Sequence, residues 1–140
     1  MIRSVLRSFG AVLTSTVAVA FAASHLGCAS YGPGTRVAVQ DVEPLIGTWK
    51  GTVYRSSFAP DSVTLTVHDD GSFDVVSVLP SGTSTGSGKI VVNDGRLLVE
   101  GTRGRGTGTL HRNPAGGLVL NVEMTLNDNS TLTAKLWPSH

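Results

Sequence analysis

Apolar and polar residues alternate along most of the chain from residue 45 onward. A period of two is typical of a β-strand with one buried face, because successive side chains of a strand point to opposite faces of the sheet. The alternation is clearest in residues 117–125, and no segment in this part of the chain has the period of a long helix. The predicted strands are 45–55, 62–68, 72–79, 86–92, 96–101, 105–112, 117–125 and 130–137.

Turn residues separate these segments at intervals of about ten residues. Asp69-Asp70-Gly71 and Asn93-Asp94-Gly95 are typical of tight hairpins, whose turn residues need a positive φ. Short turns between successive strands predict an antiparallel meander, and eight strands are enough to close into a barrel without exposed edges. We therefore predict an all-β fold in which residues 45–140 form an eight-stranded antiparallel up-and-down barrel. A two-sheet sandwich is the alternative.

The alternation also predicts which side chains fill the interior. Trp49 is expected to anchor the core, together with the in-phase valines and leucines. Four glycines also lie on inward positions, as expected where barrel strands bend sharply: Gly86, Gly88, Gly106 and Gly108. They leave space that either holds a small apolar ligand or is closed by the strands. An eight-stranded barrel is narrow enough for side chains to fill, so a filled interior is favoured.

Residues 1–27 have the order of a secretory signal peptide. Arg3 and Arg7 form a basic start, and an uncharged apolar run extends from Phe9 to Ala23. The run is too short and too rich in alanine and threonine for a typical membrane-spanning helix. Cys28 follows directly and is the only cysteine of the chain, so it cannot form an internal disulfide.

The residues Ser24-His25-Leu26-Gly27-Cys28 resemble the lipoprotein box of bacterial lipoproteins, although His25 stands where that box usually has leucine. The resemblance implies removal of residues 1–27, lipid attachment at Cys28 that includes palmitate, and anchoring in the bacterial cell envelope. Ala29, in place of aspartate, implies the outer membrane. Residues 28–44 would then be a lipidated cysteine and a flexible tether. The alternative is ordinary cleavage after Ala22, which would give a secreted or periplasmic protein.

A second resemblance lies at the start of the first predicted strand. Gly47-Thr48-Trp49 resembles the Gly-X-Trp opening of lipocalins and, more loosely, the openings of avidin-like barrels and of bacterial protease-inhibitor barrels. The lipocalin resemblance implies a barrel that carries a small hydrophobic ligand. The second lipocalin motif and the biotin-binding tryptophans of avidins are absent from the sequence, so no particular ligand is implied.

The charge balance gives no reason to expect nucleic-acid binding. Removal of residues 1–27 takes away two arginines and leaves nine basic and ten acidic side chains. The mature chain is therefore nearly neutral. Arg103, Arg105 and Arg112 are expected to serve as ordinary solubilising charge, and a small basic patch at one rim is the less favoured alternative.

No group of residues predicts catalysis, a cofactor or a metal. The glycine-rich segment 82–89 resembles a phosphate-binding loop, but isoleucine follows its lysine and no helix comes after it. His68, Asp69 and Asp70 could form an exposed cation site, although a solvated strand end explains them better. The outward carboxylates Asp74, Glu100 and Glu123 belong to separate strands.

These observations favour a non-catalytic binding module in the bacterial envelope. In the first hypothesis its rim loops bind an envelope protein or a glycan. In the second it is a lipocalin-like carrier of a small apolar molecule. In the third it is a protease inhibitor whose segment 29–44 enters the cleft of a protease.

Overall fold

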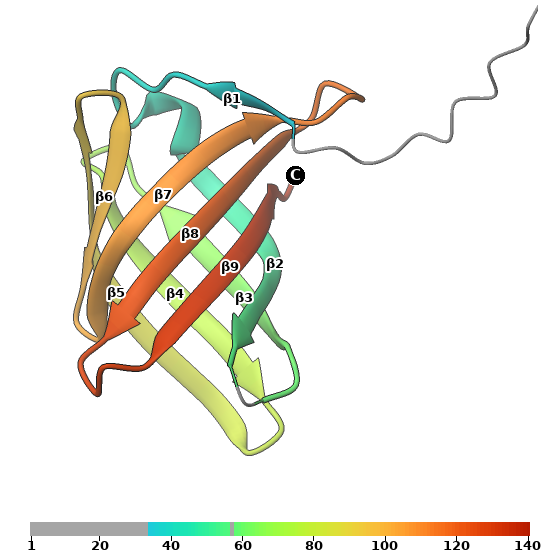
Figure 1. Ribbon diagram of the computed structural model, residues 1–140, viewed down its shortest axis with the longest axis vertical. Helices are drawn as coiled ribbons and strands as arrows, with labels where there is room; N and C mark the ends of the chain where they lie inside the picture. Colours follow the sequence, from blue (N-terminus) through green and yellow to red (C-terminus); the bar gives the residue numbers. More distant parts are fainter. Residues whose placement is uncertain (1–33, 57) are drawn as a thin grey trace, which may run out of the picture. The chain divides into compact units, whose positions relative to one another are not determined.

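The computed structural model describes residues 34–56 and 58–140 (Figure 1). The predicted signal peptide, Cys28 and residues 29–33 lie outside this part of the chain. No helix within the described ranges is long and apolar enough to cross a membrane. The elements are β1 (Thr35–Val37), the 3-10 helix η1 (Glu43–Leu45), β2 (Gly47–Arg55), β3 (Asp61–Val67), β4 (Ser72–Leu79), β5 (Gly82–Asn93), β6 (Arg96–Gly101), β7 (Gly104–Arg112), β8 (Leu118–Leu126) and β9 (Thr131–Pro138).

Strands β2 to β9 form a closed antiparallel barrel. Each strand pairs with the next along the chain, and β2 pairs with β9, from Trp49 opposite Pro138 to Arg55 opposite Leu132. This closure confirms the predicted eight-stranded up-and-down barrel and excludes the sandwich. Because every barrel strand has two neighbours, no long edge is left to pair with another chain.

The predicted strand boundaries lie within a few residues of the observed ones, except in β5. Its ladder with β4 begins at Gly82, opposite Leu79, and not at residue 86. Residues 82–85 are Gly, Thr, Ser and Thr, and none of them is buried. The sequence lacks an apolar alternation there because this end of the hairpin extends beyond the packed core.

The strand β1 and the segment that follows it were not predicted. β1 pairs with the end of β7, where Val37 lies opposite Leu110, beyond the point at which β6 stops pairing. The chain then crosses the end of the barrel at which β2 begins (Figure 1), and it buries Val39 and Leu45 in the core. Residues 35–44 are therefore part of the folded domain and not the flexible tether that was expected. A three-residue strand is too short for its alternation to be recognised.

Large side chains fill the end of the barrel at which β2 begins, and we call it the closed end. Trp49 is 2% exposed, and its indole Nε1–H donates a hydrogen bond to the carbonyl oxygen of Leu45 at 2.7 Å. The predicted role of Trp49 as a core anchor is thus confirmed. Other fully or almost fully buried side chains in the same cluster are Val67, Leu97, Leu110 and Leu120.

The inward glycines allow neighbouring strands to pass close to one another. A Cβ atom on Gly106 would lie 1.9 Å from the carbonyl oxygen of Glu123, and one on Gly88 would lie 2.1 Å from that of Glu100. Neither position has room for a side chain, because the coiled sheet brings the adjacent backbone across it. The prediction that the barrel needs glycine at such positions is confirmed for these two residues.

Candidate ligand-binding cavity

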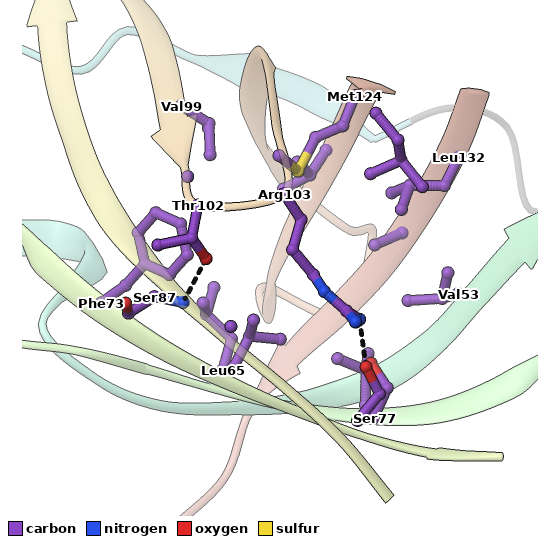
Figure 2. A pocket seen from close by; sticks show the side chains of 18 of the residues that line it. Val53, Leu65, Phe73, Ser77, Ser87, Val99, Thr102, Arg103, Met124 and Leu132 are labelled. Carbon is purple, nitrogen blue, oxygen red and sulfur yellow. Dashed lines mark hydrogen bonds between the residues drawn. The ribbon is translucent and has the colours of Figure 1, made fainter. Parts of the chain in front are cut away.

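A cavity of about 520 Å³ occupies the other half of the barrel, at the end where β2 ends and β3 begins. We call this the open end. Figure 2 shows the cavity between strands that belong to opposite sides of the barrel. Its wall is mainly apolar and includes Val53, Leu65, Phe73, Val99, Met124 and Leu132.

The cavity exists because the inward positions of this half carry small side chains. Ala134 and Gly86 line it, whereas corresponding positions near the closed end carry tryptophan and leucines. A Cβ atom on Gly86 would meet only side chains, the nearest being Val75 Cγ1 at 3.2 Å. The expectation of a filled interior is therefore correct for the closed half and wrong for the open half.

Polar side chains surround the mouth of the cavity, and Arg103 is the most prominent of them (Figure 2). Its guanidinium group donates a hydrogen bond to the hydroxyl of Ser84 across the mouth. Its aliphatic stem lies inside the rim, because Cδ is 3.6 Å from where a Cβ atom on Gly86 would be. The missing side chain of Gly86 thus makes room for Arg103.

The two-residue turn that carries Arg103 is held from both sides. The backbone N–H of Thr102 donates to the carbonyl oxygen of Ser87 at 2.9 Å. On the other side, the backbone N–H of Asn127 donates to the carbonyl oxygen of Arg103 at 2.9 Å. The side-chain amide of Asn127 donates to the carbonyl oxygen of Thr102 at 3.1 Å. The turn is therefore fixed to β5 and to the β8–β9 turn.

A second arginine, Arg55, lines the mouth at the end of β2. Its Nε lies 3.9 Å from Oδ2 of Asp61, a carboxylate that is only 5% exposed. This distance is too long for a hydrogen bond, and the buried Nε–H has no partner among the described residues. Buried donors are nearly always satisfied, so this unpaired Nε–H is unusual.

Asp128 is the carboxylate that lines the mouth, but its hydrogen bonds serve its own turn. It accepts a hydrogen bond from the backbone N–H of Ser130 at 2.9 Å and another from the Ser130 hydroxyl. These bonds lower the pKa of Asp128, and the positive charge of Arg55 lowers it slightly further. Asp128 therefore stays ionised and stabilises the β8–β9 hairpin.

His68 and Asp70, considered as a possible cation site, form hydrogen bonds with separate partners. His68 Nε2 lies 2.9 Å from Oδ2 of Asp74 on the outer face, while Asp70 accepts hydrogen bonds from the backbone N–H and hydroxyl of Ser72. The bond to Asp74 raises the pKa of His68, with smaller contributions from the charges of Asp70 and Asp69. The bonds from Ser72 lower the pKa of Asp70. Within the described ranges, no three His, Cys, Asp or Glu side chains are grouped as metal ligands.

The three arginines considered as a possible basic patch do not lie together. Arg105 and Arg112 both lie on β7, and Arg112 is at the closed end, where its side chain donates to the carbonyl oxygen of Gly116 at 2.8 Å. Arg103 lies beyond the other end of β7. A strand of this length separates its two ends by about 25 Å. Of these three arginines, only Arg103 lines the cavity.

Sequence reasoning missed Arg55 and Asp61, although a signal was present. Arg55 lies in phase with Trp49 and Val53, so the alternation places it on the inner face. A charged residue at an inward position near a strand end points to a polar mouth. The glycine-rich segment 82–89, in contrast, lies within β5 and does not form a phosphate-binding loop.

Comparisons with known proteins support the fold alone. No protein-family model matches the chain, and no curated protein does. Among solved structures, the chain is similar to a redesigned β-barrel, with a TM-score of 0.53 and 19% sequence identity over 69% of this chain and 92% of the other. At this identity the likeness carries no information about a ligand. The resemblances to lipoproteins and lipocalins gain no support from it.

Proposed function

We propose that this protein is a non-catalytic binding protein that holds a small, mainly apolar molecule in the open half of its barrel. The observation that carries the proposal is the cavity of about 520 Å³ with an apolar wall and a few polar groups at its mouth. Ligand pockets typically have volumes of about 300–1,000 Å³ and this distribution of polarity.

The closed end supports a binding role. Segment 39–45 and Trp49 fill that half, so the interior is a cup with one entrance and not a channel. A molecule inside it would contact apolar side chains from several strands. Each Å² of apolar surface removed from water stabilises the complex by about 25 cal/mol, before the costs of association are subtracted.

Binding of a neutral apolar fluorophore, phenylnaphthylamine, tests this proposal. We expect saturable binding with a blue-shifted emission. Ala134→Phe places a ring in the cavity and should abolish binding, whereas Thr133→Phe adds the same ring on the exposed outer face and should not. Circular dichroism of both variants checks that they fold. Unchanged binding to folded Ala134→Phe, or no binding to the wild-type protein, would show that the cavity is not a binding site.

We further propose that the protein is exported and anchored by a lipid at Cys28. The order of basic, apolar and small residues in 1–27 and the position of Cys28 support this proposal. Metabolic labelling with palmitate in a bacterial host tests it. We expect label on the wild-type protein and none on Cys28→Ala, and equal labelling of the two would exclude attachment at Cys28.

A further inference from the structure

The cavity mouth combines one arginine that lacks an acidic partner with several neutral hydrogen-bond donors. The ion pairs found among the described residues are Arg55 with Asp61 and His68 with Asp74, so Arg103 has no carboxylate partner in that part of the chain. It contacts only the neutral hydroxyl of Ser84. Its positive charge therefore remains available at the entrance to an apolar space.

From this arrangement, and resting on the proposed function, we infer that the ligand is a single-chain amphiphile with an anionic head group, such as a long-chain carboxylate. Its tail would occupy the apolar cavity, and its head group would accept hydrogen bonds from the guanidinium group of Arg103. A guanidinium group binds a carboxylate through two parallel N–H donors, and such charge-assisted bonds are about twice as strong as neutral ones.

The position of Arg103 fits this role. Its stem runs along the inner side of the rim past Gly86, so its charged end faces the mouth and not the outer surface. The backbone of its turn is fixed by bonds to Ser87 and Asn127, which reduces the ordering needed when a ligand binds. The cavity lining also includes Ser77, whose hydroxyl adds a neutral polar group beside Ser84.

The other charged groups at the mouth do not cancel the charge of Arg103. Neither carboxylate forms an ion pair with Arg103: Asp61 lies beside Arg55, and the charged neighbour that lowers the pKa of Asp128 is also Arg55. Arg55 is partly neutralised by Asp61, and its unpaired Nε–H is buried. Arg103 is therefore the principal determinant of head-group charge, and Arg55 contributes less.

Three compounds with the same alkyl tail test the inference: lauric acid, dodecanol and dodecylamine. Each is titrated into the full-length protein below its aggregation concentration, with displacement of phenylnaphthylamine as the readout. We expect laurate to bind about tenfold more tightly than dodecanol, which corresponds to about 1.4 kcal/mol, and dodecylamine to bind most weakly. Acetate, which has a carboxylate but no tail, should not displace the fluorophore.

Arg103→Met removes the charge but keeps an apolar stem of similar length. We expect it to weaken laurate binding about tenfold and to leave dodecanol binding unchanged. Arg105→Met is the matched control, because Arg105 is exposed on β7 and does not line the cavity. It should leave both affinities unchanged.

Several outcomes would overturn the inference. Equal affinities for laurate and dodecanol would refute the anionic head group while leaving the cavity a binding site. An equal loss of both ligands in Arg103→Met would show that the residue acts only through packing. Equal effects of Arg103→Met and Arg105→Met would show a general charge effect. If none of the three tailed compounds bound the wild-type protein, the proposed function itself would fail.

Discussion

The hydrogen bond between Trp49 and Leu45 is expected to hold the chain segment 39–45 on the closed end of the barrel. Trp49→Phe removes the indole N–H that donates to the carbonyl oxygen of Leu45 at 2.7 Å. Both residues are almost completely buried, so water cannot replace the donor. An orphaned buried acceptor costs about 1–3 kcal/mol.

The smaller ring of phenylalanine also leaves unfilled space, which adds about 1 kcal/mol because the surroundings relax only partly. We therefore expect Trp49→Phe to lower the free energy of unfolding by about 2–4 kcal/mol. For a domain of this size, each kcal/mol lowers Tm by about 4–8 °C. Guanidinium chloride unfolding, followed by far-UV circular dichroism, measures the change in free energy.

Trp137→Phe is the matched control. Trp137 lies on β9 and is 40% exposed, and its ring faces the ammonium group of Lys135 at 5.7 Å. Weakening of this exposed cation–π contact by the smaller phenylalanine ring should cost no more than about 1 kcal/mol. If the two variants unfolded at the same denaturant concentration, the Trp49 hydrogen bond would not be what secures segment 39–45.

Two further predictions concern the barrel wall and its outer face. Gly106→Ala should destabilise the fold by several kcal/mol, roughly the range of a core disruption, because the new Cβ atom would lie 1.9 Å from the backbone oxygen of Glu123. Gly86→Ala should cost much less, because its Cβ atom would meet only side chains. Thermal unfolding of the two variants compares their stabilities. NMR titration should show a pKa of His68 above 6.5, and Asp74→Asn should lower it. Because the folded pKa is raised, the stabilisation by protonated His68 is complete below pH 6.5 and is lost as the pH rises through the folded pKa. An unshifted His68 would contradict the Asp74 contact.

Much of the barrel could be predicted because alternation is a local signal. The position of Trp49 inside, the inward glycines and the order of the strands all follow from a period of two and from short turns. β1 could not be recognised, since its three residues carry no repeated pattern, and its place beside β7 depends on how far β6 extends.

The cavity could not be predicted for a different physical reason. Alternation shows which face of a strand is inward, but not which residues of different strands lie at the same height in the barrel. Gly86, Val53 and Ala134 leave a space only because the strand register brings small residues together in the open half. Arg103 lies in a turn, where no periodicity indicates the direction of its side chain.

The bonds that fix the Thr102–Arg103 turn also determine how a bulky molecule would enter. This part of the rim is joined to both neighbouring segments through backbone amides, so it cannot swing outward without breaking those bonds. A molecule that enters therefore does so without opening this part of the rim, and the Thr102 and Asn127 amides should remain protected from hydrogen exchange when a ligand binds.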